Sequence, residues 1–243
     1  MPEGPSIVIL KEAVQQFTGH KIIAVSGDSK IDINRLENQT VIAFKSWGKH
    51  FLICFENFTI KVHLLMFGTY RINERKDTTP RLSLAFSNGE LNLYTCSVKL
   101  LEGNVNLHYD WTADVMNKEW NPKSAKKKLN LIPNKMICDA ILEQDIFSGV
   151  GNIIKNEVLY RTFVQPESLV GKLPVVTLTK IINECSKYSF EFLEWKKNYV
   201  LKEHWLAHTK KVCQRCDLPF KYKKTGVKNR RSFYCLNCQK LYS

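Results

Sequence analysis

Two Cys-x-x-Cys pairs near the end of the chain constrain its fold more than any other feature. Cys213 and Cys216 form the first pair, and Cys235 and Cys238 follow after the 18 residues 217–234. This spacing is typical of a four-thiolate zinc site, with a Thr-Gly step that favours a hairpin between the pairs. The sequence therefore predicts a small zinc finger with one structural Zn²⁺, because four thiolates leave no coordination position for water.

The finger is strongly cationic, and so is the whole chain. Lys and Arg number 36 against 23 Asp and Glu, a formal net charge of +13, which favours a polyanionic partner such as nucleic acid. We expect the basic residues between the cysteine pairs to contact phosphate, and a solvated basic loop is the competing interpretation. These residues are Lys221, Lys223, Lys224, Lys228, Arg230 and Arg231.

The other four cysteines stand alone in apolar surroundings and are predicted to be small buried hydrophobes without disulfides. They are Cys54, Cys96, Cys138 and Cys185. The sequence has no run of 18 apolar residues and no secretory pattern at its start, so we expect an intracellular protein without membrane contact.

Hydrophobic periodicity divides the rest of the chain. Pro5 suits a first helical turn, and apolar residues recur at helical spacing from Ile7 to Phe17 before Gly19. Short β-type segments follow over 21–103, with a hairpin at the Asn-Gly step 88–89, which predicts a sandwich or a barrel-like sheet. The leading helix would hold positions 2 and 3 against a folded body.

Helical patterns take over after Tyr109. One helix carries the apolar residues 137, 140 and 141, and a Gly-rich break follows in which Asn152 is placed to cap a second helix. A third helix covers 177–199, where Ile181, Ile182, Phe190 and Leu193 are predicted core residues.

Five segments in order resemble the formamidopyrimidine-DNA glycosylase and endonuclease VIII family: MPEGP, WGKHFLI, HLLMFGTYRI, SGVGNIIKNE and RRSFYCLNCQK. The resemblance covers nearly the whole chain. It implies an α+β multidomain protein: an N-terminal catalytic β-sandwich with a leading helix (1–112), a helix-two-turn-helix domain (113–207) and a C-terminal four-cysteine zinc finger (208–243). It also implies a monomer that binds damaged double-stranded DNA and is cytoplasmic or associated with the nucleoid.

The resemblance assigns roles to individual residues. Pro2 would be the nucleophile and Glu3 its acid/base partner. Lys49, Asn152 and Arg230 would hold phosphate, with Lys49 and Arg230 also counted in the catalytic site. Arg230 is preferred to Arg231 because the family arginine lies five positions before the third zinc cysteine. Met66 and its neighbour Phe67 match the position that fills the gap left by an extrahelical nucleotide; a methionine buried in a core strand is the alternative.

These assignments explain why a proline stands at position 2. An α-amino group loses its proton at a much lower pH than lysine, so a Pro2 freed of Met1 would be a ready nucleophile. Its attack on the sugar C1′ gives a cationic iminium, and elimination of the 3′ and then the 5′ phosphate can follow. Without the other motifs, Pro2 and Glu3 would be no more than a helix leader.

The activity implied is that of a base-excision repair DNA glycosylase and AP lyase. Ser6 and the segment YTCSVKLLEG, with Val98 and Leu100, depart from the formamidopyrimidine branch, and the chain before Cys213 is short. These departures favour the endonuclease VIII branch and oxidised pyrimidines. The alternatives are an oxidised-purine glycosylase acting on formamidopyrimidine or 8-oxoguanine, and a non-catalytic zinc-ribbon protein that binds nucleic acid.

Overall fold

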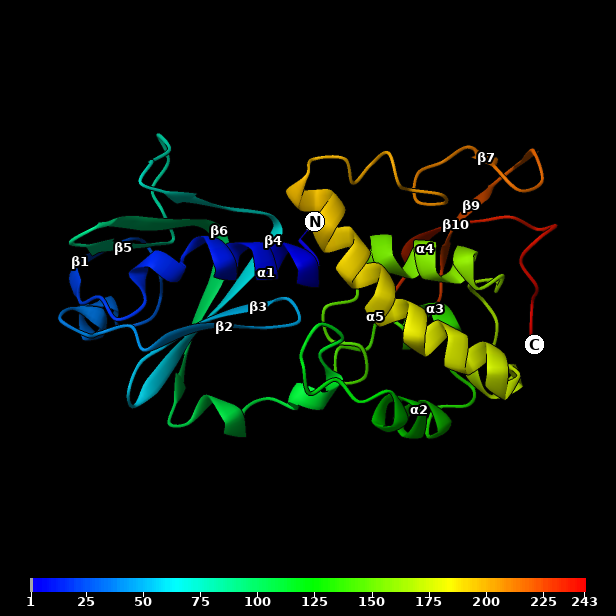
Figure 1. Ribbon diagram of the computed structural model, residues 1–243, viewed down its shortest axis with the longest axis horizontal. Coiled ribbons are helices and arrows are strands. Elements are labelled where there is room, and N and C mark those ends of the chain that lie inside the picture. The colour runs from blue at the N-terminus through cyan, green and yellow to red at the C-terminus, as the bar shows by residue number, and fades with distance from the viewer. Residues whose placement is uncertain (1) are drawn as a thin grey trace. The chain divides into compact units, whose positions relative to one another are not determined.

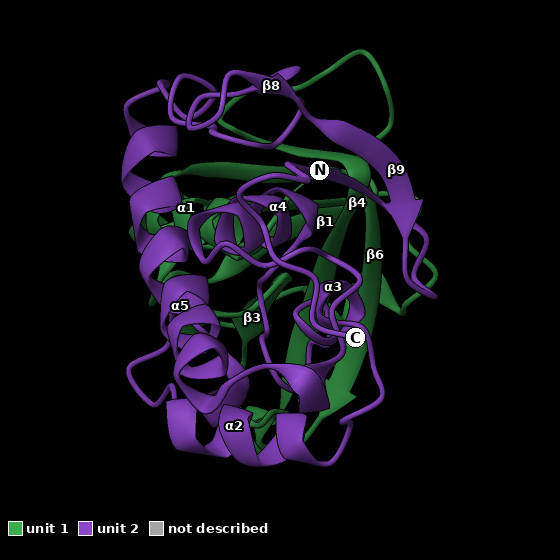
Figure 2. Cartoon of the chain, turned by 90° about the vertical axis from the view of Figure 1, so that its right-hand side faces the viewer, with its two compact units in different colours: residues 1–110 green, residues 111–243 purple. Residues whose placement is uncertain are grey.

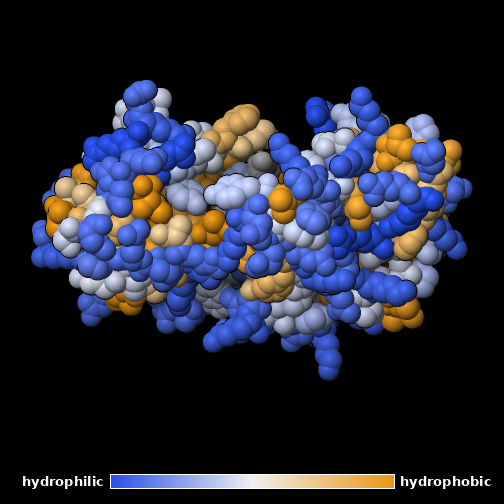
Figure 3. All heavy atoms as spheres, turned by 45° about the horizontal axis from the view of Figure 1, so that its top comes forward, coloured by the Kyte–Doolittle hydropathy of each residue, from blue (hydrophilic) through white to orange (hydrophobic). Residues whose placement is uncertain are grey.

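The computed structural model describes residues 2–243, and these form two compact units, one up to Asp110 and one from Trp111 onward (Figure 2). The further division into a helical domain and a finger at residue 207 stays a prediction. In the part of the chain that is described, no helix is long and apolar enough to cross a membrane. Hydrophilic residues cover most of the face drawn in Figure 3, and hydrophobic residues lie between them in separate patches.

The N-terminal unit is an antiparallel sheet of order β1-β5-β6-β4-β3-β2 with one helix, α1 (Figure 1). Its elements are α1 (Gly4–Ala13), β1 (Ile22–Ser26), β2 (Ala43–Trp47), β3 (His50–Cys54), β4 (Phe58–Ile72), β5 (Leu82–Phe86) and β6 (Gly89–Glu102), with short 3₁₀ helices at Gln15–Phe17, Ile33–Leu36 and Val105–Leu107.

The two longest strands, β4 and β6, turn this sheet into a sandwich. They pair with each other along most of their length, and each also pairs with one further strand over part of it: β4 with β3 in its first half and β6 with β5 near its start. Ile60 and Val62 from one half and Leu91 and Leu93 from the other are all fully buried in one core. The predicted N-terminal sandwich with a leading helix is therefore confirmed.

The C-terminal unit contains the remaining helices and the finger. Its elements are α2 (Pro122–Asn130), α3 (Ile137–Ala140), α4 (Asn152–Arg161), α5 (Val175–Lys197), β7 (Val212–Cys213), β8 (Leu218–Pro219), β9 (Lys221–Thr225) and β10 (Arg230–Tyr234), with 3₁₀ turns at Trp111–Ala113 and Val170–Lys172. Helices α4 and α5 lie side by side (Figure 1) and share a core with α2 and α3.

Most sequence-based expectations for this unit are met, and two details are wrong. The predicted core residue Phe190 is 48% exposed, because it lies two positions, about 200° of helix, from the buried Tyr188 and Phe192. Asn152 does not cap α4: Gly151 is the N-cap and Asn152 is the first helical residue. All four isolated cysteines are buried, as predicted.

Candidate active site and zinc site

Pro2 and Glu3 immediately precede α1, and the packing of that helix holds them in place. Ile7 and Leu10 of α1 are fully buried, and the Ser6 amide donates to the Glu3 carbonyl over 2.8 Å. Pro2 is half-buried, while Glu3 is only 1% exposed. The fold of this unit therefore holds a buried carboxyl group, that of Glu3, next to Pro2.

Lys49 lies in the tight turn between β2 and β3. Trp47 pairs with His50, so Gly48 and Lys49 alone form the turn, and Gly48 has the positive φ of 52° that this geometry favours. Helix α1 packs against both β2 and β3. The helix that carries Pro2 and Glu3 and the hairpin that carries Lys49 therefore belong to one packed body.

A pair of histidines beside Lys49 escaped the sequence analysis. His50 on β3 and His63 on β4 face each other with ring centroids 5.7 Å apart, and Tyr109 packs on His50. Burial lowers the pKa of His50 to about 4, helped by Lys61, His63 and Lys49. Burial also lowers the pKa of His63, helped by Lys49 and Lys61. Both rings are therefore neutral near pH 7. The only sequence signal was a lysine close before each histidine, Lys49 before His50 and Lys61 before His63.

Met66 and Phe67 occupy a large bulge in β4. The register passes from Leu64 opposite Cys96 to Thr69 opposite Tyr94, so residues 65–68 face the single residue 95. Met66 is 54% exposed and Phe67 78% exposed. Any side chain on Gly68 would meet the backbone of Leu64 within 2.9 Å. The bulge excludes Met66 from the core, contrary to the alternative raised above.

In the C-terminal unit, α4 is attached to the free edge of β10. The Arg231 carbonyl accepts hydrogen bonds from Asn152 Nδ2 (3.0 Å), Lys155 Nζ (3.1 Å) and Asn156 Nδ2 (3.2 Å). Lys155 is fully buried and also donates to Ser232 Oγ over 2.8 Å. Side chains of α4 thus fix the backbone of β10 at Arg231, which keeps Arg230 and Arg231 close to Asn152.

The alternation of β10 separates the two arginines. Arg230 shares a strand face with Ser232, the residue that contacts Lys155 of α4. Arg231 points to the opposite face, where its guanidinium lies 5.9 Å from the ring of Tyr222. The strand therefore places Arg230, and not Arg231, on the face that adjoins α4.

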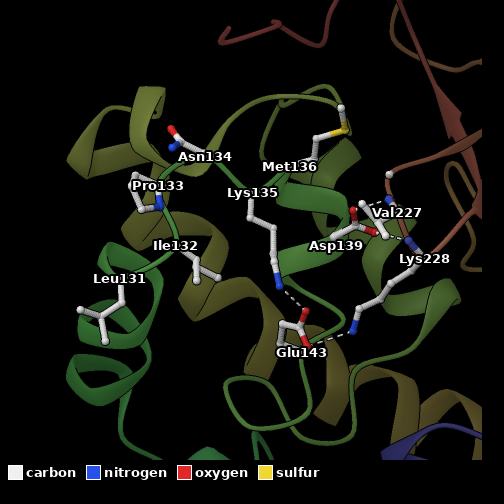
Figure 4. Close-up of a pocket in the computed structure, with 11 residues that line it drawn as sticks. Leu131, Ile132, Pro133, Asn134, Lys135, Met136, Asp139, Glu143, Val227 and Lys228 are labelled. Atoms are coloured by element: carbon white, nitrogen blue, oxygen red, sulfur yellow. Dashed lines mark hydrogen bonds and ion pairs between the residues drawn. The ribbon is translucent and has the colours of Figure 1, made fainter.

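The turn of the finger hairpin docks on α3 through Asp139 (Figure 4). This carboxylate, 3% exposed, accepts the backbone N–H groups of Val227 (2.7 Å) and Lys228 (3.1 Å). A Cβ on Gly226 would come within 2.3 Å of Asp139 Oδ2, so only glycine fits. Glu143 ion-pairs with Lys228 Nζ at 3.1 Å beside a pocket of about 750 Å³.

A second buried carboxylate holds the chain that leads into the finger. Glu157 of α4 is fully buried and accepts the backbone N–H groups of Leu206, Ala207 and His208 at 2.7–3.0 Å. Burial raises the pKa of Glu157, and the three N–H groups and Arg161 act against that rise. Side chains of α4 thus fix both the entry and the hairpin of the finger.

The four predicted zinc ligands come together. The sulfur atoms of Cys213, Cys216, Cys235 and Cys238 all lie within 4.8 Å of one another. Donors surround them: the Tyr160 hydroxyl is 3.4 Å from Cys213 Sγ, Asn237 Nδ2 donates to Cys216 Sγ over 3.3 Å, and Arg215 Nη1 donates to Cys238 Sγ over 3.6 Å. Four clustered sulfurs with such outer donors suit a tetrahedral thiolate-bound zinc ion.

Comparison with known proteins finds one matching domain family and several proteins of similar sequence. Residues 1–98 match the family described as the formamidopyrimidine-DNA glycosylase N-terminal domain. Endonuclease 8-like 3 of Xenopus laevis is 24% identical over 90% of this chain but only 38% of its own length. The chain thus spans less than half of that relative. Formamidopyrimidine-DNA glycosylase of Lactobacillus helveticus (strain DPC 4571) is 23% identical over the full length of both chains.

The fold is shared as well. A crystal structure of Lactococcus lactis formamidopyrimidine-DNA glycosylase, bound non-covalently to DNA containing an AP site, superimposes with a TM-score of 0.86 at 20% identity, covering 98% of this chain and 99% of the other. A viral DNA glycosylase superimposes with a TM-score of 0.84 over 98% of this chain. With the clustered cysteines and the sandwich, these matches show that the chain has the fold of the formamidopyrimidine-DNA glycosylases and that residues 1–98 are similar to the N-terminal domain of that family.

Proposed function

We propose that this protein is a DNA glycosylase with AP lyase activity that uses Pro2 as its nucleophile. The observation that carries the proposal is the buried carboxyl of Glu3 beside a half-buried Pro2, both held by α1. Burying a carboxyl is costly, and a group kept beside a potential nucleophile despite that cost is suited to proton transfer. Damaged double-stranded DNA is the proposed substrate, so the protein would work inside the cell, in the cytoplasm or associated with the nucleoid.

The proposed chemistry begins with Pro2 freed of Met1. Its nitrogen lone pair bonds to the sugar C1′, the bond from C1′ to the base breaks, and the base leaves with that electron pair and takes up a proton. Glu3 donates a proton to the sugar ring oxygen as the ring opens to the iminium. Loss of a C2′ proton then forms a C2′–C3′ double bond and expels the 3′ phosphate. A second elimination releases the 5′ phosphate, and water frees Pro2 from the remaining sugar fragment.

Residues from both units would hold the DNA. Lys49 in its turn, and Asn152 and Arg230 on the α4–β10 joint, are proposed to hold phosphates around the lesion. Met66 and Phe67, exposed on the β4 bulge, are proposed to fill the gap left when the nucleotide leaves the stack. A structural Zn²⁺ on the four cysteines would keep the finger folded.

Borohydride trapping on DNA with an abasic site tests the nucleophile. A covalent adduct is expected with the mature chain, none with a form that retains Met1, and far less with Pro2→Gly. If the mature chain gives no adduct while it binds the same DNA, the catalytic proposal is wrong and the non-catalytic zinc-ribbon alternative takes its place.

We further propose oxidised pyrimidines as the preferred lesions, on the departures from the formamidopyrimidine branch noted above. Excision should then be faster for thymine glycol than for 8-oxoguanine, each tested opposite every base. The reverse order would assign the chain to oxidised purines and leave the Pro2 chemistry unaffected.

A further inference from the structure

Three lysines lie in one row across the face of the N-terminal sheet that points away from its apolar core. Lys45, Leu52, Lys61 and Lys99 are in register on the adjacent strands β2, β3, β4 and β6. The next residues along these strands point the other way, into the sandwich core, where Phe51 and Val62 are among those fully buried. The lysines of this row therefore share the face away from that core; Leu52 between them is fully buried, Lys45 and Lys61 are half-buried, and Lys99 is exposed.

Two of these lysines are directly opposed. Lys61 and Lys99 form a cross-strand pair on β4 and β6, an arrangement of like charges that destabilises a sheet. Burial lowers the pKa of Lys61, and the charge of Lys99 lowers it further. Among residues 2–243, neither ammonium group has a carboxylate partner. An external anion would relieve this repulsion.

The row continues toward the proposed active site. His63 lies two residues from Lys61 on the same face of β4, and both Lys49 and Lys61 lower its pKa. Positive charge thus extends from Lys49 past His63 to Lys61 and Lys99. We call the three lysines Lys49, Lys61 and Lys99 the lysine strip. With about 6.7 Å between alternate residues and about 4.8 Å between strands, the strip covers about 10–15 Å. That length matches about two or three successive phosphates along one DNA strand.

We propose that Lys61 and Lys99 of the lysine strip bind the backbone of one DNA strand beyond the phosphate held by Lys49. This inference rests on the proposed function, because Lys49 is the assumed starting point. Lysine ammonium groups suit the role: they are compact point charges that attract phosphate without reading bases. The strip would therefore lengthen the DNA footprint and raise affinity for any sequence.

The double variant K61Q/K99Q tests the proposal. The slope of log K against log salt should fall by about 1.8, or about 0.9 for each lost phosphate contact. The matched control K21Q/K30Q removes the same charge at two exposed lysines of the same unit, and its slope should be unchanged. Thermal unfolding should show K61Q/K99Q at least as stable as the wild type, because a repulsive pair is removed.

Shortened duplexes locate the contact. Trimming one arm beside the lesion should weaken binding of the wild type and of the control but not of K61Q/K99Q, whereas trimming the other arm should weaken all three alike. An unchanged salt slope for K61Q/K99Q, or equal losses on both arms, overturns the strip even if Pro2 traps DNA normally. If Pro2 fails to trap DNA but trimming the two duplex arms has the effects expected above, only the catalytic proposal is overturned.

Discussion

The two units hold their candidate DNA-contacting residues by different physical means. In the N-terminal unit, α1 and the sandwich bury a continuous apolar core, and Pro2, Glu3 and Lys49 stand at the ends of elements fixed by that core. In the C-terminal unit, Asn152 and Arg230 depend on buried polar groups, chiefly Lys155 and the Arg231 carbonyl, and on a cysteine cluster.

This contrast follows from size. The predicted finger, residues 208–243, is too small to bury enough apolar surface to fix its own position, so hydrogen bonds to α4 and α3 hold it, together with the proposed Zn²⁺. Directional bonds of this kind hold geometry firmly but fail abruptly when one partner is removed. Damage to the finger should therefore be severe and local, and damage to the sandwich more graded.

Loss of a zinc ligand should have the largest effect. Cys213→Ser is expected to lose zinc and to weaken DNA binding by at least about a hundredfold, because the proposed phosphate contacts of the finger are lost together. Metal analysis and DNA titration measure this result. Far-ultraviolet circular dichroism should still show the strands of the N-terminal unit; full DNA binding after zinc removal would contradict the role of the finger.

Removal of the buried amine should come second. Lys155→Met takes two hydrogen bonds from the α4–β10 joint and should lower the free energy of unfolding by about 2 kcal/mol. DNA affinity should fall about tenfold, since Arg230 is no longer held in position. Zinc content should stay unchanged. The control Lys180→Met lies on the exposed side of α5 and should behave as wild type.

Lowering the pH should reduce the stability of the sandwich through its half-buried histidine, His50. The pKa of His50 is lowered from 6.5 to about 4 in the folded chain. At pH values between these two, His50 is therefore protonated in the unfolded chain but neutral in the folded chain. Stability should therefore fall as the pH drops from 6.5 to 4, by about 1–2 kcal/mol for this partly exposed ring. Urea unfolding should show that His50→Gln loses this contribution, whereas His20→Gln, beside Ser87, retains it.

The smallest effect separates the two arginines. Arg230→Ala should reduce the salt slope of DNA binding by about 0.9, one phosphate contact. Arg231→Ala should leave the slope nearer to wild type, because its side chain lies on the other strand face over Tyr222. The opposite result would transfer the phosphate contact to Arg231.

Much of the fold could be read in advance because its signals are local. The spacing of the cysteine pairs, the alternation over 21–103 and the helical recurrence of apolar residues each depend on neighbours a few positions apart. Phe190 shows the limit of this reasoning, since an aromatic residue inside an apolar helix can still fall on its exposed side.

The sequence by itself indicated the resemblance to the formamidopyrimidine-DNA glycosylase and endonuclease VIII family, the order of sandwich, helices and finger, and the set of four cysteines. Only the tertiary structure decided that Glu3 is buried, that a bulge turns Met66 outward, that Lys61 faces Lys99, and that Lys155 bonds to residues 76 and 77 positions away. The reason is physical: burial, register and cross-chain hydrogen bonds arise from packing between distant segments, and no local pattern records them.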